Sequence, residues 1–200
     1  FSPGGVNLYV SVLLRPRLAA RQLGAFSFIA SLALADTVKE LGAHPAIKWP
    51  NDVLVEGKKI GGSLVECAIR DDEVDYVILG VGVNLNVEEI ALRAALGRSA
   101  GFATSLAAAV GHEIDRNAFA AAYLNHLDCW ARTWELQGAD AIVKAWRERD
   151  ILIGRRVDVR GPVSAVQGWV TGLAATGHLV VRDTGGRHRV LASEEVRLID

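Results

Sequence analysis

The sequence predicts an α+β protein, with a mixed or antiparallel sheet and packed helices followed by a small β-barrel. Two observations support this prediction. Short apolar runs follow one another closely between residues 46 and 84, without the intervening helices that a wound parallel sheet requires. Beyond Asp150, glycines separate short runs of β-branched residues, which is typical of a compact barrel of about fifty residues. We therefore expect one domain over residues 1–152 and a second over residues 153–200.

The composition argues against several classes of protein. Of the 200 residues, 50% are hydrophobic and 22% are charged, so the chain can bury a core and is not disordered. The net charge is -1, whereas proteins that bind nucleic acid or membrane surfaces usually carry a basic surplus. No apolar run approaches the length of about 18 residues that a membrane span needs. Cys67 and Cys129 show neither metal-ligand spacing nor a disulfide framework, so we expect reduced thiols and a cytoplasmic protein.

Local patterns define the elements of the first domain. Residues 6–14 are rich in β-branched and apolar side chains, which predicts a strand. Apolar residues at helical spacing predict a helix over residues 27–41, with Gly42 at its end. Short strands are predicted over residues 46–49, 53–55 and 59–68, and a longer strand over residues 75–84 that is apolar on both faces.

Helices are expected over residues 87–96, 104–110 and 117–136. The last is the strongest prediction, because apolar and aromatic residues recur there every three or four positions until Gly138 ends the helix. We interpret this stripe as core rather than as a cofactor site. Its members are Phe119, Tyr123, Leu127, Trp130 and Trp134.

The stretch KWPNDVLVEGKKIGGSLVE, residues 48–66, places an amide, a carboxylate and a lysine on consecutive strand ends. A hairpin of this length brings Lys59 back beside Asn51 and Asp52, and Gly61-Gly62 then exposes backbone against which a flat ligand can lie. An ammonium beside a carboxylate and an amide suits a site for anionic groups. Spacing alone leaves a second interpretation open, namely an ordinary charged hairpin.

The stretch ILGVGVNLN, residues 78–86, alternates glycines along an apolar strand. Gly80, Gly82 and Asn84 therefore share one face, which favours a groove for a planar ligand that ends in an amide. A strand with a bulge stays open as the alternative. The pattern is not a dinucleotide fingerprint, because no third glycine opens a helix.

Together, KWPND, GKKIGG and GVGVN at this spacing resemble the combined signature of the biotin protein ligases, the biotin–[acetyl-CoA-carboxylase] ligases. The resemblance covers nearly the whole chain. It implies a catalytic domain of the biotin/lipoate ligase type followed by an SH3-like C-terminal domain. FSPGGVNLYVS resembles the family strand that follows a mobile glycine- and arginine-rich loop, so we expect that loop just before Phe1, and weak biotin binding by residues 1–200 alone.

The resemblance implies a reaction in two steps. The carboxylate of biotin attacks the α-phosphate of ATP, giving biotinyl-5′-adenylate and pyrophosphate. A lysine of a biotin carboxyl carrier protein then attacks the mixed anhydride and releases AMP. ATP with Mg²⁺ is the implied cofactor, and biotin and the carrier domain are the implied partners.

The same resemblance assigns roles to residues of the two stretches. Lys59 corresponds to the lysine that contacts the biotin carboxylate and the α-phosphate. Asn51 and Asp52 lie at the adenylate, and Asp52 is the candidate for orienting or deprotonating the carrier lysine. Asn84 resembles a residue at the nucleotide phosphates, through Mg²⁺. The positions that resemble walls of the biotin pocket are Gly62, Leu64 and Gly80. Trp49 is expected to pack beneath the sheet.

Two alternatives remain at this point. Lipoate ligases and lipoyl or octanoyl transferases share the fold and an ND…GxKIxG pattern, so Lys59 alone does not distinguish them from biotin ligases. Biotin is favoured by Trp49-Pro50, by GVGVNLN and by the C-terminal tail. The other alternative is a biotin-binding or dimerising fragment without catalysis. In that interpretation the strand over residues 75–84 pairs edge to edge with a second copy to form a homodimer.

Overall fold

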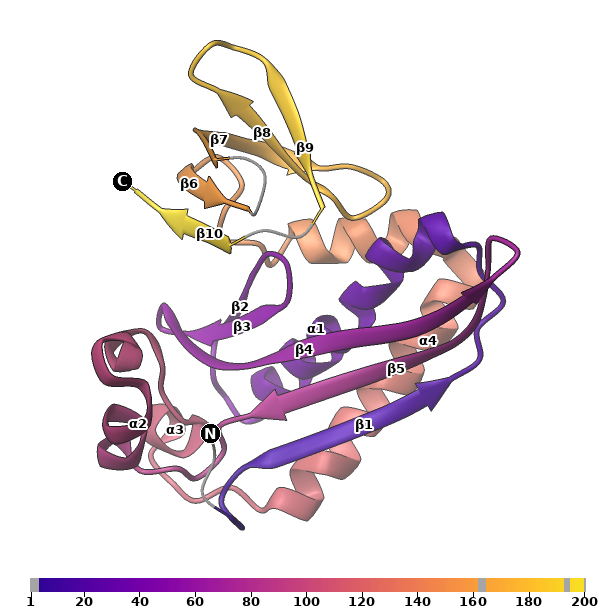
Figure 1. Ribbon diagram of the computed structural model, residues 1–200. Coiled ribbons are helices and arrows are strands. Elements are labelled where there is room, and N and C mark those ends of the chain that lie inside the picture. The colour runs from indigo at the N-terminus through magenta and orange to yellow at the C-terminus, as the bar shows by residue number, and fades with distance from the viewer. Residues whose placement is uncertain (1–3, 162–164, 193–194, 200) are drawn as a thin grey trace.

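The computed structural model describes residues 4–161, 165–192 and 195–199 (Figure 1). The strands of the first sheet are β1 (Leu8–Leu14), β2 (Pro45–Lys48), β3 (Asp52–Val55), β4 (Lys58–Arg70) and β5 (Glu73–Val83). The helices are η1 (Ala20–Gln22), α1 (Leu23–Glu40), α2 (Glu89–Leu96), η2 (Gly97–Phe102), α3 (Leu106–Val110) and α4 (Arg116–Arg147). The strands of the second sheet are β6 (Arg156–Arg160), β7 (Ala165–Leu173), β8 (Leu179–Asp183), β9 (His188–Leu191) and β10 (Glu195–Leu198). The protein is thus α+β, and the pairings between these named strands are all antiparallel.

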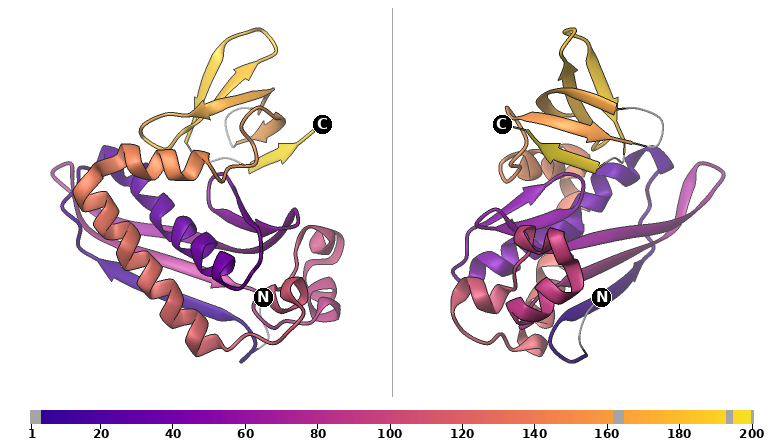
Figure 2. Two further views of the ribbon diagram at one scale, coloured as in Figure 1. Left: turned by 180° about the vertical axis from the view of Figure 1, so that it is seen from behind. Right: turned by 60° about the vertical axis from the view of Figure 1, so that its left-hand side comes forward.

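Helices α1 and α4 cover one face of the first sheet, as Figure 2 shows from behind. Almost every residue of α1 between Ala25 and Val38 is buried, because the first sheet and α4 pack against this helix. Phe28 of α1 stacks on Trp146 of α4, with ring centroids 3.8 Å apart. Within the described residues, the other face of the sheet carries no such layer of helices, and its side chains are accordingly more exposed.

Helix α4 begins where the Asp115 carboxylate accepts hydrogen bonds from the backbone N–H groups of Asn117 (2.8 Å) and Ala118 (3.0 Å). This arrangement satisfies N–H groups that have no partner within the helix. Gly138 has a φ of 73° and divides α4 into two helical segments at a kink, at the residue where the sequence predicted a helix end. The predicted core role of the aromatic stripe is confirmed at its buried members, Phe119, Tyr123, Leu127 and Trp134.

The first sheet has the strand order β1-β5-β4-β3-β2. Strand β5 lies between β1 and β4, so both of its edges are already hydrogen-bonded. The predicted pairing of residues 75–84 with a second copy is therefore wrong. The two-sided burial predicted for this strand is also wrong, because Val77, Leu79 and Val81 face the helices whereas Gly80 and Gly82 lie on the open face.

The second sheet has the order β10-β6-β7-β8-β9. Its buried side chains include Val157, Val159, Val170 and Val181. Among residues 153–161, 165–192 and 195–199, the pairings end at β10 and β9, so they form a small antiparallel β-unit rather than a closed barrel. In the described part of the chain, no helix combines the length and apolarity that crossing a membrane would require.

Candidate functional site

The β3–β4 hairpin brings the predicted lysine and carboxylate together. Asp52 pairs with Gly62 across the hairpin, and the register shifts between Val53 and Leu54. The Nζ of Lys59 forms an ion pair with Oδ1 of Asp52. The Lys59 side chain is 48% exposed and the Asp52 side chain 23% exposed, so the pair lies at the surface of the molecule and solvent reaches its cationic end. The predicted proximity of these two residues is confirmed.

Asn51 is held by its neighbours in a different way. Its side-chain amide donates to the backbone carbonyl oxygen of Ser63. The backbone carbonyl oxygen of Asn51 in turn accepts from the Ser63 N–H at 3.1 Å. The hydroxyls of Ser31 and Ser63 lie 3.0 Å apart, which ties α1 to the same point. The amide of Asn51 therefore fixes the tip of the β2–β3 hairpin against β4. Ser31 and Ser63 were not predicted as site residues, since neither lies in a pattern that distinguishes it from other serines.

A cavity of about 570 Å³ opens beside Lys59 on the exposed face of the first sheet. Its floor is formed by backbone, because Gly62 lies opposite Gly82 and Leu64 lies opposite Gly80 in neighbouring strands. Its other lining residues include Tyr9, Ser11, Asn51, Asn84, Leu92 and Leu96. The predicted shared face of Gly80, Gly82 and Asn84 is thus confirmed. A planar ligand can approach this floor closely, since glycine presents no side chain there.

Tyr9 forms a wall that sequence reasoning missed. A methyl group on Gly82 would lie 3.1 Å from Cε1 of Tyr9, so the ring lies directly over this glycine. Tyr9 and Leu64 are 62% and 64% exposed, which makes this part of the cavity apolar and open. The alternation in β1 predicts that Tyr9 and Ser11 share a face, but the pairing with β5 that brings them to the cavity is a long-range contact.

Asn84 anchors the segment that follows β5. Its side-chain amide donates to the carbonyl oxygen of Thr104 at 3.2 Å, and its own carbonyl oxygen accepts from Leu106 N–H at 2.8 Å. Thr104 N–H in turn donates to the Lys59 carbonyl oxygen at 3.0 Å. The described residues contain no group of three or more His, Cys, Asp or Glu side chains that could hold a metal ion. Asn84 thus lines the cavity beside Lys59 and holds the segment that carries Thr104 and Leu106.

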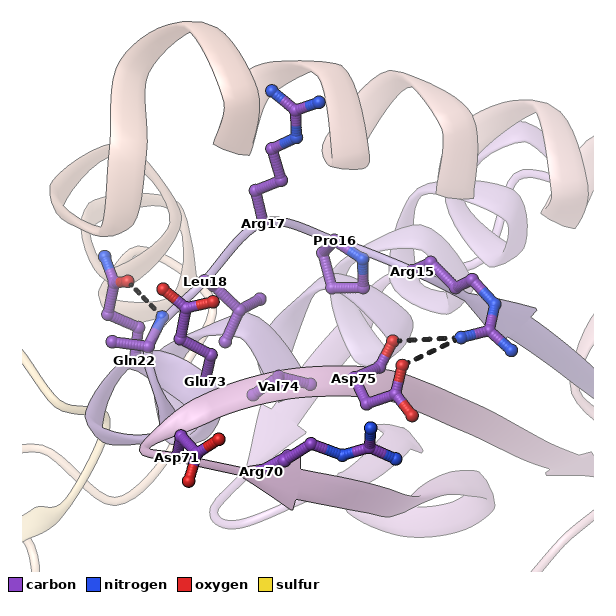
Figure 3. A pocket seen from close by; sticks show the side chains of 11 residues that line it. Arg15, Pro16, Arg17, Leu18, Gln22, Arg70, Asp71, Glu73, Val74 and Asp75 are labelled. Carbon is purple, nitrogen blue, oxygen red and sulfur yellow. Dashed lines mark hydrogen bonds and ion pairs between the residues drawn. The ribbon is translucent and has the colours of Figure 1, made fainter.

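A second cavity, of about 660 Å³, lies at the opposite end of the β4–β5 pair (Figure 3). Arg15, Arg17 and Arg70 line it together with acidic residues. Arg15 Nη1 forms a 2.9 Å ion pair with Asp75 Oδ1 and also donates to the Asp75 carbonyl oxygen at 3.4 Å, as the two dashed lines between these residues in Figure 3 show. The opposite charges balance one another, and none of the residues from the two sequence motifs lies here. The cavity beside Lys59 is therefore the candidate site.

Comparison with protein families gives a match of residues 1–84 to the Biotin/lipoate A/B protein ligase family. The chain is 31% identical over 195 residues to a biotin–[acetyl-CoA-carboxylase] ligase of Paracoccus denitrificans, with 96% of this chain and 80% of that protein covered. It is 34% identical over 181 residues to the ligase of the same name from Mycobacterium tuberculosis, covering 86% and 62%. It is 28% identical to the bifunctional ligase/repressor BirA of Bacillus subtilis and spans 59% of that protein's length.

Solved structures show the same fold. The apo structure of the Aquifex aeolicus biotin protein ligase matches with a TM-score of 0.83 at 23% identity, covering 97% of this chain and 83% of that one. The structure of that enzyme with biotin and ATP matches with a TM-score of 0.77 at 23% identity, covering 97% and 78%. These structures establish the fold alone. The family is established by the sequence identity to the Paracoccus protein, which extends over most of both chains. The chain belongs to the family of biotin–[acetyl-CoA-carboxylase] ligases.

Proposed function

We propose that this chain carries the catalytic site of a biotin protein ligase, which makes biotinyl-5′-adenylate from biotin and ATP and transfers biotin to a lysine of a biotin carboxyl carrier protein. One observation supports this most directly: the Lys59–Asp52 ion pair borders a glycine-floored cavity in a member of this family. The chain spans 59% of one curated relative and 80% of another, so the activity is proposed for the full-length protein.

The cavity suits biotin in size and chemistry. Small-molecule sites are usually clefts of about 300–1,000 Å³ with mostly apolar walls, and this one measures about 570 Å³. We assign the walls of the biotin site to Gly62, Leu64 and Gly80. The fused rings of biotin lie on the glycine backbone, and its carboxylate extends toward Lys59.

In the first step, a carboxylate oxygen of biotin attacks the α-phosphorus of ATP and pyrophosphate leaves. Two anions must approach one another, and a fixed cation lowers the cost of that approach. Lys59 supplies this cation, contacting both the biotin carboxylate and the α-phosphate. Its exposed ammonium and its position at the cavity border support the assignment.

In the second step, the amine of the carrier lysine attacks the acyl carbon of biotinyl-5′-adenylate, and AMP leaves. The incoming ammonium must first lose a proton to become a nucleophile. Asp52 orients this group and accepts the proton. The Asp52 carboxylate already forms an ion pair with the ammonium of Lys59, so its position also suits the ammonium of the carrier lysine.

We place the adenylate beside Asn51, Asp52, Lys59 and Asn84. Mg²⁺ prefers oxygen ligands and is usually held by substrate phosphates with one or two carboxylates. Because the Asn84 amide nitrogen is bonded to Thr104, this residue offers only its side-chain oxygen to such an ion. The Mg²⁺ of this proposal is therefore carried mainly by the phosphates of ATP.

The second sheet forms a separate domain in this proposal. We assign residues 1–152 to the catalytic domain and residues 153–200 to an SH3-like C-terminal domain. The antiparallel pairing of five short strands around a small apolar core supports this assignment. We also place the protein in the cytoplasm, where its two free cysteines stay reduced.

Titration of the full-length protein with biotin and with lipoate tests the function. Pyrophosphate release in the presence of ATP is the readout. Release with biotin and at least about tenfold weaker release with lipoate is the expected result, a factor equivalent to about 1.4 kcal/mol of discrimination. Preferential release with lipoate would instead assign the protein to the lipoate branch of the family that matches residues 1–84.

A further inference from the structure

The tip of the β2–β3 hairpin contacts the second sheet as well as the first. Trp49 is 2% exposed, and its Nε1–H donates to the carbonyl oxygen of Gly177 at 3.0 Å. Gly177 lies in the turn between β7 and β8. Figure 1 shows the second sheet on the far side of this hairpin from β4. The residue before Pro50-Asn51-Asp52 is thus bonded to the C-terminal part of the chain.

The β7–β8 turn presents this carbonyl from a closed conformation. Gly177 N–H donates to the Ala174 carbonyl oxygen at 2.9 Å, and Ala174 N–H donates to the His178 carbonyl oxygen at the same distance. The Thr176 hydroxyl lies 3.1 Å from Nδ1 of His178. Gly177 has a φ of 86°, a left-handed conformation that favours glycine. The turn is therefore held by its own hydrogen bonds.

Backbone atoms of the turn also touch the start of α1. A methyl group on Gly24 would lie 2.4 Å from the Thr176 carbonyl oxygen. A methyl group on Gly177 would lie 2.8 Å from the carbonyl carbon of Gly24 and 2.9 Å from the nitrogen of Ala25. Side-chain rotation cannot relieve these contacts, because the opposing atoms are all backbone. The two glycines consequently fix the distance between the turn and α1.

The segment that leads into the second sheet is attached to the same hairpin. Ile47 N–H donates to the Arg149 carbonyl oxygen at 2.8 Å, and Ile151 N–H donates to the Ile47 carbonyl oxygen at 3.0 Å. These bonds cover the outer edge of β2. The hairpin is thus joined at Ile47 to the chain that enters the second sheet, and at Trp49 to a turn within it.

We propose that the β7–β8 turn positions the catalytic tip: through Trp49, and through its backbone contact with Gly24, it sets where Asn51 and Asp52 lie relative to Lys59. This inference rests on the proposed function. Asn51 and Asp52 follow Trp49 by two and three residues, so a displacement of the Trp49 backbone is passed to them along the chain. Displacement of a reacting group by about 1 Å can cost about 10²-fold in rate.

Two variants of the full-length protein test the proposal, each with a matched control. Trp49→Phe keeps a buried ring and removes the N–H donor, and Trp169→Phe makes the same change on β7 at a 41% exposed position. Gly177→Ala adds a methyl group against α1. Gly186→Ala adds one at a similar φ of 81° in the β8–β9 turn, where no heavy atom of the described residues lies within 4 Å.

The main measurement is the single-turnover rate constant of each step. In Trp49→Phe and Gly177→Ala, transfer from preformed biotinyl-adenylate should slow about tenfold more than adenylation does, as expected for loss of a buried hydrogen bond near the group that acts in transfer. Loss of folded protein would lower the amplitudes of both steps and leave both rate constants unchanged. Trp169→Phe and Gly186→Ala should retain the wild-type ratio.

Hydrogen exchange gives a readout that does not depend on the reaction. Ser63 N–H donates to the Asn51 carbonyl oxygen, so its exchange reports on the hairpin tip. It should accelerate in Trp49→Phe and Gly177→Ala but not in their controls. If Gly177→Ala does not fold, the comparison of Trp49→Phe with Trp169→Phe tests the proposal by itself.

Unchanged Ser63 exchange together with an unchanged ratio of rate constants would overturn the proposal. Absence of biotin-dependent pyrophosphate release in the wild type would instead contradict the proposed function. Ser63 exchange alone would then decide whether the turn positions the tip.

Discussion

The ammonium of Lys59 and the carboxylate of Asp52 form an ion pair across the β3–β4 hairpin. The two groups that we assign to different steps of the reaction are therefore in direct contact. Gly62 is the third member of this arrangement, because a methyl group there would lie 3.2 Å from the Asp52 carboxylate and 3.5 Å from Cε of Lys59. A larger residue at position 62 would crowd the Asp52 carboxylate and the Asn51 carbonyl oxygen, which would lie 3.0 Å from the added methyl group.

Lys59→Ala should strongly reduce adenylate formation and leave the fold intact. Loss of an ionic contact at a transferring phosphoryl group is typically worth about 10²–10³ in rate. Biotin-dependent pyrophosphate release measures this step, and thermal melting monitors the fold. The control is Lys58→Ala, which removes the neighbouring exposed lysine at the start of β4. Equal adenylation rates in the two variants would show that Lys59 has no part in the chemistry.

Asp52→Asn should slow transfer to the carrier at least as much as adenylation. An amide keeps the shape of the carboxylate but cannot take the proton of the carrier lysine, and general-base catalysis typically contributes about 10²–10⁴-fold. Transfer from preformed biotinyl-adenylate in a single turnover is the measurement. Glu56→Gln, in the β3–β4 turn, controls for removal of a negative charge nearby. A normal transfer rate would rule out Asp52 as the base.

Gly61→Ala should lower the stability of the fold, whereas Gly80→Ala should weaken biotin binding. A methyl group on Gly61 would lie 2.6 Å from the Gly82 carbonyl oxygen, so this variant should lose about 1–3 kcal/mol of stability through overpacking. A methyl group on Gly80 would extend toward the cavity, and its nearest neighbour among the described residues would be the Leu64 carbonyl oxygen at 3.6 Å. Gly80→Ala should therefore melt near the wild-type temperature but bind biotin more weakly in calorimetry. Wild-type affinity in that variant would place biotin elsewhere.

Asp150→Asn should change how stability depends on pH. Burial raises the pKa of the Asp150 carboxyl, against the lowering effect of hydrogen bonds from Leu152, Ile153 and Trp146. The folded state then holds the proton more tightly than the unfolded chain does. The stabilising contribution of the protonated carboxyl is therefore present at acid pH and is lost as the pH rises through the raised pKa.

Denaturant unfolding of the wild type and Asp150→Asn across this pH range measures the effect. The free energy of unfolding of the wild type should fall relative to that of the variant as the pH rises. Asp128→Asn, at an exposed position on α4, is the control for the loss of an acidic group. A constant difference between wild type and Asp150→Asn would show that Asp150 titrates alike in both states.

The sequence by itself determined the elements and the local geometry of the site. Alternation and helical spacing depend on neighbouring residues, so the strands of the first sheet, helix α1 and the part of α4 before Gly138 were predicted within a few residues of their observed bounds. The approach of Lys59 to Asp52 was also predictable, because the two strands of a short hairpin must lie side by side. Glycine and amide patterns then pointed to the cavity face of β4 and β5.

Only the tertiary structure decided which elements far apart in the chain meet. Strand β1 pairs with β5 about seventy positions later, which places Tyr9 over Gly82 and makes β5 an interior strand. The bond from Trp49 to Gly177 joins residues 128 positions apart. No local pattern encodes such contacts, since they depend on the free energy of packing whole elements together against the entropy of closing long loops. The chemistry of this site can thus be predicted from nearby residues, whereas its walls and its positioning follow from the assembled fold.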